Sequence, residues 1–430
     1  MLSLYIGLAA VLTAILAAAS FALLVERGGV GRAGDRLVSR SVERWFGRRA
    51  RIGWDWRAVV ALFAAGYALI VGFDLAHGFY ACVPGAGPSD LAGLLASGRA
   101  LGSGGNPFVV NDCGSSVVLP YGLAAVALDA VGSLGGAPGI AAVWGIVGLS
   151  LVPLVWFLAD DDARYVTVLL ASSPIFLPVI AGQIDGASNA IVPVGVLLAI
   201  LLARRRGTLG AVVGGLLSTA RFPSLFGVLA ASGSRPRRFV TAGVALGAFG
   251  GGSAIAYVRW GSSFLNAVLF SQASRHAFSL NAFGILLIAG ELPGGLALPV
   301  AQALATLAVT LGAFLTVRSP VRSASIALTG VALLTQFLSY PILLWLIPVV
   351  LLGRRERWWL WGISVVGSLN FYLALDTLGW GAGIYWPTEV LDAVVTVLLL
   401  GLLVELWRNA RSDVLRAGSS TGAAMTSPGG

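Results

Sequence analysis

The side chains that could do chemistry are few, and they stand between long apolar segments. The longest polar interruption covers residues 90–121 and opens with Asp90, while a second carboxylate, Asp74, ends the apolar segment before it. A carboxylate can act as general base toward a hydroxyl group, and an arginine can hold a phosphate through paired N–H donors. Placed beside lipid, such groups suit transfer from a lipid phosphate, with arginines stabilising the phosphate as it leaves.

Arg221 is the most informative cation because it stands alone in the apolar stretch around STARFPS. A charge inside the membrane is costly, so such a residue usually faces a cavity or a partner. Contact with a phosphate is one interpretation, and snorkelling or pairing with Asp185 or Asp129 is the other. Further candidates for phosphate contact are Arg259, Arg275 and His276. For Arg275 and His276, contact with the acceptor sugar and ordinary solvation in a loop are the alternatives.

Other polar residues are better suited to shaping a cavity than to reacting. Gln183 and Asp185 in the sequence GQIDG, and Asn106 in the sequence GGNPF, are assigned this role. Asp129 is interpreted as a hydrogen-bonded structural group. Asp90 also has a structural alternative, because it precedes a helical pattern and could cap that helix.

Composition places the chain in the bilayer. Of its 430 residues 57% are hydrophobic and only 11% are charged. Because a bilayer admits only helices or closed barrels, the recurring apolar runs predict an all-α polytopic membrane protein of roughly ten to thirteen transmembrane helices, several of them short or broken. The net charge of +9 comes from clusters between the runs, which indicates cytoplasmic anchors rather than a nucleic-acid partner. The sequence contains no Walker loop and no metal-ligand motif, so no cofactor is predicted.

The basic clusters also predict the topology of the first part of the chain. Residues 1–57 comprise an extra N-terminal span and a basic segment expected on the cytoplasmic face. Residues 58–73 then cross outward, so the loop 75–116 is expected outside the cytoplasm as the catalytic edge. Cys82 and Cys113 lie in this loop, where an oxidising compartment would allow a disulfide; unpaired thiols are the alternative.

The middle of the chain does not fit simple alternation. With spans at 117–134 and 139–159, the acidic residues 160–162 and the arginines 204–206 cannot both be placed comfortably. A half-helix or short hairpin is therefore predicted somewhere in residues 117–190.

Two later segments are predicted to be broken in the same way. Residues 208–232 are expected to form two short helices that meet near Arg221 and Pro223. Residues 323–352 are expected to divide at Pro341. Broken helices are tolerated at membrane depth where they line a polar cavity.

The remaining apolar segments predict single spans. These are 239–258, 295–317, 358–375 and 389–407, with a second outer loop over 259–281. The membrane domain is expected to cover residues 58–416. The small polar segment 417–430 is predicted to be a disordered tail.

Several motifs, taken in their order, resemble a known family. The run from Asp90 through Arg99 to GGNPF, the helix VVLPYGLAAVALDAVG, the segment SSPIFLPVIAGQIDGASNAIVPVG and the segment LLSTARFPSLFGVLA are similar to successive elements of polyprenol-dependent C-type membrane glycosyltransferases. The closest resemblance is to the family-87, mannosyltransferase-like group. This chain departs from that group at Arg221, Asp185 and Phe108, where the family often has Lys, Asn and Tyr.

The resemblance implies an enzyme of the plasma membrane with its active site outside the cytoplasm. It would move a sugar, with mannose favoured, from a polyprenyl phosphate to a glycolipid or envelope-glycan acceptor, inverting the anomeric centre. Position in the motif assigns the base to Asp90, with Asp74 as its rival. The substrate, not a cofactor, carries the phosphate, and a role for a divalent cation stays open.

Two other functions remain alternatives. A multi-pass transporter or flippase of lipid-linked sugars would explain broken helices and buried charges, but would usually show inverted repeats. A ligase or polymerase of lipid-linked glycans would place its main outer loop later in the chain.

Overall fold

The structure of the chain is a computed structural model. It describes residues 2–28, 56–76, 90–112, 115–118, 121–159, 163–176, 179–180, 188–234, 236–270, 297–335, 340–353, 356–378 and 386–424.

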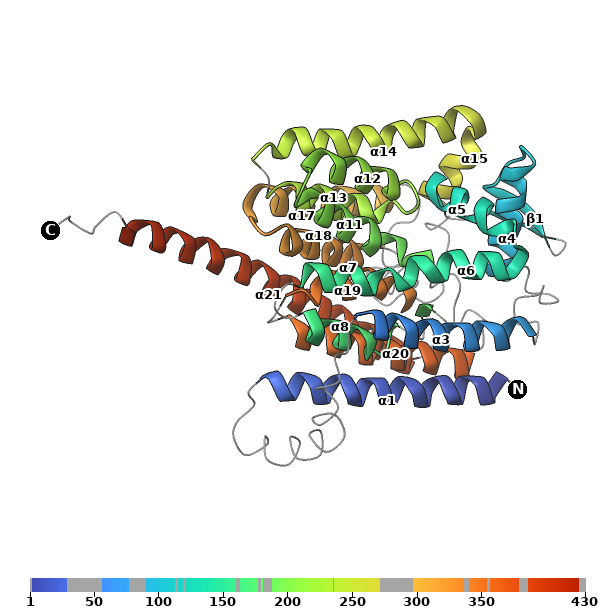
Figure 1. Ribbon diagram of the computed structural model, residues 1–430, viewed down its shortest axis with the longest axis horizontal. Helices are drawn as coiled ribbons and strands as arrows, with labels where there is room; N and C mark the ends of the chain where they lie inside the picture. Colours follow the sequence, from blue (N-terminus) through green and yellow to red (C-terminus); the bar gives the residue numbers. More distant parts are fainter. Residues whose placement is uncertain are drawn as a thin grey trace.

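Long, roughly parallel helices build the molecule (Figure 1). Within the described residues, four helical stretches are long and apolar enough to cross a bilayer: α3 (Trp56–Ala76), α6 with α7 (Gly136–Leu149 and Leu151–Leu158), α14 (Arg238–Trp260) and α21 (Trp386–Ala424). Three more helices of 20 or more residues run beside them: α1 (Leu2–Gly28), α17 (Ala297–Thr316) and α20 (Arg357–Leu378). The chain is an α-helical membrane protein in these parts, as predicted.

Shorter helices fill the space between the long ones. They are α8 (Ala163–Ala171), α11 (Ile191–Ala203), α12 (Gly207–Ser218), α13 (Pro223–Ser232), α18 (Pro320–Leu334), the 3₁₀ helix η4 (Tyr340–Trp345) and α19 (Ile347–Val350). At 1.5 Å per residue the longest of them, α18, reaches only about 22 Å, less than the roughly 30 Å of a bilayer core. The breaks predicted near Pro223 and Pro341 are confirmed.

In the described part of the chain the short helices form three pairs of consecutive elements: α8 with α11, α12 with α13, and α18 with η4 and α19. Each pair begins and ends at the same end of the bundle. Arg204, after α11, donates to the carbonyl oxygens of Phe157 and Leu158 at the end of α7, both at 3.2 Å. Arg322, in the first turn of α18, lies 3.9 Å from Glu356, which follows α19. We call this the basic end.

The pairing of short helices explains why a simple alternation of spans does not fit the middle of the chain. Residues 139–159 form α6 and α7, whereas α8 and α11 turn back within the bundle, so the end of α7 and the arginine triplet after α11 lie at one end. The span expected at 117–134 is wrong, because only the 11-residue α5 (Leu123–Ser133) forms there. At about 16 Å it is too short to cross.

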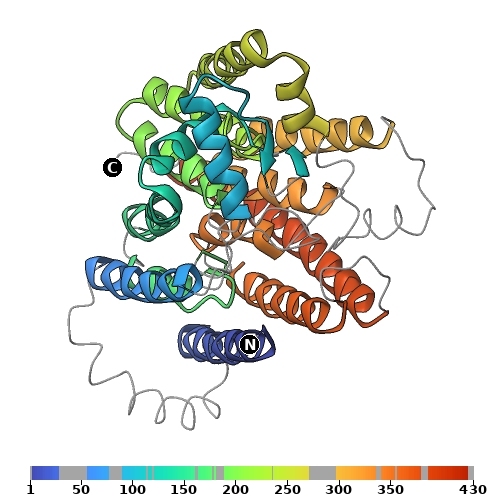
Figure 2. The ribbon, with the colours of Figure 1, turned by 90° about the vertical axis from the view of Figure 1, so that its right-hand side faces the viewer.

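The opposite end carries the first polar loop, and we call it the α4 end. Helix α4 (Asp90–Gly102) lies across the ends of the long helices (Figure 2). After it come the antiparallel strands β1 (Val109–Asp112) and β2 (Ser115–Val118), paired Val109 to Val118, and then α5. Helix α15 (Ser262–Leu265) and the π-helix η3 (Asn266–Phe270) lie at the same end. The small hairpin was not predicted by the all-α expectation.

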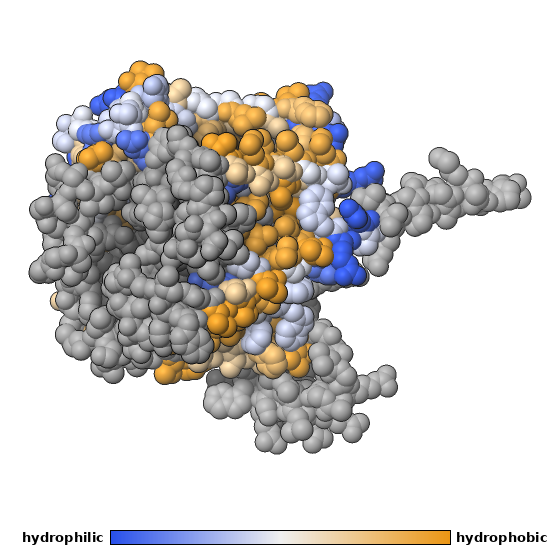
Figure 3. Space-filling view, turned by 180° about the vertical axis from the view of Figure 1, so that it is seen from behind, coloured by the Kyte–Doolittle hydropathy of each residue, from blue (hydrophilic) through white to orange (hydrophobic). Residues whose placement is uncertain are grey.

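Small residues let the helices of the interior approach closely. A Cβ added at Gly210 would lie 2.4 Å from the carbonyl oxygen of Ala199 on α11, and one at Gly215 would lie 2.3 Å from that of Ala245 on α14. Helix α12 is therefore held between α11 and α14 by its glycines. On the surface, hydrophobic side chains cover the middle of one face, and hydrophilic side chains gather at its right-hand edge (Figure 3). Such a band fits contact with lipid.

The helices at the two ends of the chain differ in their packing. Helix α1 packs on α20, where Trp361 Nε1 donates to the carbonyl oxygen of Ala17 at 3.1 Å and Phe21 contacts the ring of Trp358. Helix α21 continues to Ala424, so residues 417–424, expected in a disordered tail, are helical.

Replacing Gly215 by Ala should destabilise the protein by about 1–3 kcal/mol, because the new methyl group meets the backbone of α14. The matched control is Gly247→Ala on the open face of α14, where nothing lies within 4 Å and the effect should be neutral or slightly stabilising. Thermal unfolding in detergent measures both. Equal melting temperatures would contradict the packing described here.

Candidate functional site

The strongest candidate site lies where the broken helices turn inside the bundle. The turn between α12 and α13 carries Arg221, with Pro223 starting α13. Pro suits the first turn of a helix because it has no N–H to leave unpaired. The Ser224 hydroxyl donates to the Ser218 hydroxyl at 2.7 Å, which ties the start of α13 to the end of α12.

The guanidinium of Arg221 is buried and held on two sides. The residue is 6% exposed. Its Nη2 donates to the Ser188 hydroxyl at 3.1 Å, and its Cζ lies 4.6 Å from the ring centroid of Tyr121. A cation over an aromatic face is attracted by the ring quadrupole. The site therefore presents an oriented guanidinium, which is a suitable group for binding a phosphate.

The chain returning from the α4 end is fastened to this turn. The N–H of Gly122 donates to the carbonyl oxygen of Ala220 at 2.8 Å. A Cβ at Gly122 would lie 1.6 Å from the carbonyl oxygen of Thr219, so only glycine fits here. This bond satisfies a carbonyl left over where α12 stops, and it fixes Tyr121 over Arg221.

A second buried polar contact joins the other two helix pairs. Trp345 Nε1, at the end of η4, donates to the Asn189 side-chain oxygen at 2.9 Å, just before α11. Asn189 follows Ser188, which binds Arg221. The segment just before α11 thus contacts both of the other pairs through side-chain hydrogen bonds, one from Arg221 and one from Trp345.

The two predicted carboxylates both belong to the α4 end. Asp90 is the first residue of α4, as the helical pattern predicted, and Asp74 lies in the last turn of α3. Their side chains lie outside the described part. Their roles as bases stay predictions.

The rest of the α4 end is braced by aromatic residues. Trp260 Nε1 donates to the carbonyl oxygen of Gly105 at 3.1 Å, and the buried ring of Phe108 contacts those of Trp260 and Phe264. The chain after α4 is thereby attached to the end of α14. Arg259 is exposed here, with its guanidinium 5.2 Å from the Trp260 ring centroid.

Two predicted polar residues have structural partners. Asn106, assigned to a cavity, accepts the N–H of Phe108 at 3.1 Å and so stabilises the turn in GGNPF. Asp129 accepts the Trp144 indole N–H at 2.9 Å between α5 and α6, which agrees with its structural interpretation. The remaining predicted residues lie outside the described part of the chain: Gln183, Asp185, Arg275, His276, Cys82 and Cys113.

Sequence reasoning missed Tyr121 and Ser188, because their contact with Arg221 depends on tertiary structure. It also missed Asp392, a buried carboxylate of α21 that accepts a hydrogen bond from the Asn370 side chain of α20. A carboxylate inside the apolar run predicted as the span 389–407 is a signal that could have identified it.

The described residues contain no group of three or more His, Cys, Asp or Glu side chains that could hold a metal ion.

In comparisons with known proteins, no family model, no curated protein and no solved structure matches this chain.

Replacing Gly122 by Ala should lower the melting temperature and speed proteolysis of the hairpin region, because the methyl group collides with Thr219. The control is Gly66→Ala on α3, where nothing lies within 4 Å. Limited proteolysis in detergent gives the comparison. Identical digestion of the two variants would mean that residues 121 and 122 are not fastened to the Arg221 turn.

Proposed function

We propose that the protein is a membrane glycosyltransferase that moves a sugar from a polyprenyl phosphate to a glycolipid or glycan acceptor. The observation that carries the proposal is the buried Arg221, oriented by Ser188 and Tyr121 where broken helices meet. A guanidinium held in one orientation offers the charge and the paired N–H donors that bind an anionic lipid phosphate. The resemblance of the loop from Asp90 to GGNPF supplies the base.

In this reaction the acceptor hydroxyl oxygen forms a bond to the anomeric carbon from the face opposite the phosphate. Asp90, or Asp74 in its place, takes the hydroxyl proton. The bond between the anomeric carbon and the phosphate oxygen breaks, and the electron pair leaves with the lipid phosphate. Arg221 stabilises the charge that develops there. The anomeric configuration inverts.

The distribution of arginines supports one orientation of the protein in the plasma membrane. Arginines gather at the end where α7, α11 and α19 finish, and cytoplasmic loops carry an excess of Arg and Lys. The basic end would then face the cytoplasm and the α4 end the outside. A donor lipid would enter from the outer leaflet, sideways from the bilayer.

One observation favours the alternative of a transporter or flippase of lipid-linked sugars. Three pairs of short helices meet in the described interior, and discontinuous helices often form substrate sites in transporters. An assay with purified protein, polyprenyl-phosphate sugars and a glycolipid acceptor separates the two. Movement of the lipid across sealed vesicles without a new glycosidic product would favour the transporter.

Arg221→Gln should lower turnover by about 10²–10³-fold, because it removes the cation at the departing phosphate. Arg221→Lys keeps the charge and should retain activity within about tenfold. The control is Arg205→Gln, exposed at the basic end, which should leave turnover unchanged. Full activity of Arg221→Gln would overturn the assignment of the phosphate site.

Asp90→Asn should reduce turnover by about 10²–10⁴-fold, because an amide cannot accept the hydroxyl proton. Asp74→Asn tests the alternative general base in the same assay. Product formation is followed by mass spectrometry of the acceptor. If both variants keep full turnover, neither residue is the base.

A further inference from the structure

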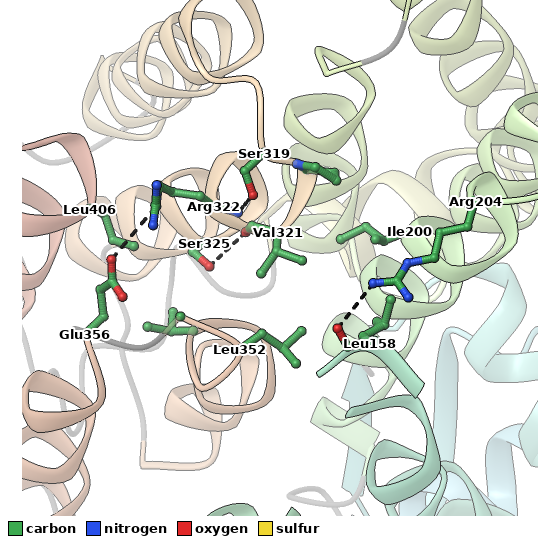
Figure 4. Close-up of a pocket in the computed structure, with 13 residues that line it drawn as sticks. Leu158, Ile200, Arg204, Ser319, Val321, Arg322, Ser325, Leu352, Glu356 and Leu406 are labelled. Atoms are coloured by element: carbon green, nitrogen blue, oxygen red, sulfur yellow. Dashed lines mark hydrogen bonds and ion pairs between the residues drawn. The ribbon is translucent and has the colours of Figure 1, made fainter. Parts of the chain in front are cut away.

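The buried carboxyl group of Asp129 differs from the other buried acids in its partners. At the basic end, Glu356 has Arg322 at 3.9 Å (Figure 4) and accepts a hydrogen bond from Asn409 at 2.9 Å. Asp129 is 0% exposed, and its Oδ1 accepts the Trp144 indole N–H at 2.9 Å, but its Oδ2 has no hydrogen-bond partner. The proposed glycosyl transfer does not use this group.

Asp129 lies where three helices are in close contact at the α4 end. Helix α4 packs on both α5 and α6. A Cβ added at Gly98 of α4 would lie 2.2 Å from the Asp129 carbonyl oxygen, and one added at Gly139 of α6 would lie 2.2 Å from that of Gly132 on α5. The backbones of α4 and α6 therefore both touch α5, and the carboxyl group between them is closed off from water.

The neighbouring helices bring no described charge into contact with Asp129. Helices α6 and α12 have no titratable side chain. The buried Ser97 hydroxyl of α4 makes no hydrogen bond itself. The titratable and charged side chains on α4 and on the nearby part of α14 are Asp90, Arg99, Tyr257 and Arg259. The last three of these are exposed, and no described residue forms an ion pair with Asp129.

A buried carboxyl group without a compensating charge favours its neutral form. Burial raises the pKa of the Asp129 carboxyl to about 8, although the hydrogen bond from Trp144 acts in the opposite direction. The group belongs to α5, which is too short to cross the membrane. Asp129 is therefore mostly protonated at neutral pH.

We propose that Asp129 is a positioning residue for α4: as a neutral acid it keeps α4 packed on α5 and α6, and the loss of its proton loosens this packing. An ionised carboxylate regains water when α4 moves away, because a buried charge without a partner is costly. Helix α4 is the element that gives way, since it lies across the ends of the long helices (Figure 2), whereas α6 also packs on α3 and α11.

This contact joins the two halves of the proposed site. Helix α4 begins with Asp90, and α5 is fastened to the Arg221 turn through Gly122. The proton on Asp129 would thus control how the predicted base is held relative to the buried guanidinium. That consequence rests on the proposed function, whereas the proton-dependent packing of α4 does not.

Hydrogen exchange of the full chain in detergent, read by mass spectrometry, tests the packing without any substrate. Exchange of the α4 amides, corrected for the intrinsic rate at each pH, should be about tenfold or more faster at about pH 8 than at about pH 5. Asp129→Asn still offers Trp144 an acceptor but has no proton to lose, so its α4 exchange should be equal at the two pH values. Helix α20, which packs on α1 and α21, is the internal control and should not change.

Thermal unfolding gives a second readout. Because the pKa of Asp129 in the folded protein lies above the ordinary value of 3.8, the unfolded chain loses the proton first. The contribution of Asp129 to stability is therefore complete below about pH 4 and is lost as the pH rises to about 8. The melting temperature of the unmodified protein, relative to that of Asp129→Asn, should fall over this range.

Trp144→Phe keeps the test decisive if Asp129→Asn does not fold. It removes the hydrogen bond that favours the ionised form, so the midpoint of the α4 transition should move to higher pH. An unchanged or lower midpoint would overturn the proposal. So would equal α4 exchange in the unmodified protein at the two pH values, or a pH dependence that Asp129→Asn retains. A missing glycosyltransferase activity would leave these results unaltered, so the two proposals can fail separately.

Discussion

The constraint on which this structure depends is that a backbone broken inside a bilayer has no water to satisfy it. Each short helix ends with carbonyl and N–H groups that need partners. The chain supplies them by bringing another segment to the break, as when the Gly122 N–H binds the Ala220 carbonyl oxygen after α12. A consequence is that residues distant in sequence meet at one place, and Arg221 lies at that place with Tyr121 and Ser188.

The arginines at the basic end and the arginine inside the bundle have different surroundings. At the basic end, Arg204 and Arg238 donate to carbonyl oxygens at the ends of α7 and α17, where helix ends carry partial negative charge. These arginines join the ends of neighbouring helices. Arg221 instead binds a hydroxyl and an aromatic ring inside the bundle. Since a surface anchor needs no burial, anchoring at a membrane surface does not explain the position of Arg221.

The sequence predicted the features that depend on neighbouring residues alone, namely helix breaks, one helix start and the long apolar helices. Pro223 and Pro341 predicted breaks because proline suits the start of a helix and not its interior. The helical pattern after Asp90 predicted α4, and long apolar runs predicted α14 and the central part of α21. The sequence also predicted that the chain reverses its direction somewhere between residues 117 and 190, although it did not determine which segment turns back.

What could not be predicted depends on contacts between distant segments. Residues 117–134 are apolar enough for a span, yet α5 has 11 residues because the β-hairpin occupies the preceding segment and the chain turns again at Leu134. The contact of Gly122 with Thr219 comes from tertiary packing, which the periodicity of hydrophobic residues in the sequence does not show. In the candidate site, the burial of Arg221 was predicted from its isolation, while its partners Tyr121 and Ser188 emerge only from the fold.

The proposed glycosyl transfer requires that Arg221 and the carboxylate of the first polar loop contact the same bound ligand. An experimental structure of the protein with a polyprenyl phosphate bound tests this requirement. Phosphate oxygens are expected within hydrogen-bond distance, roughly 2.7–3.2 Å, of the Arg221 guanidinium, with Asp90 lining the same space. A phosphate bound elsewhere, with packed protein separating Asp90 from Arg221, would contradict it.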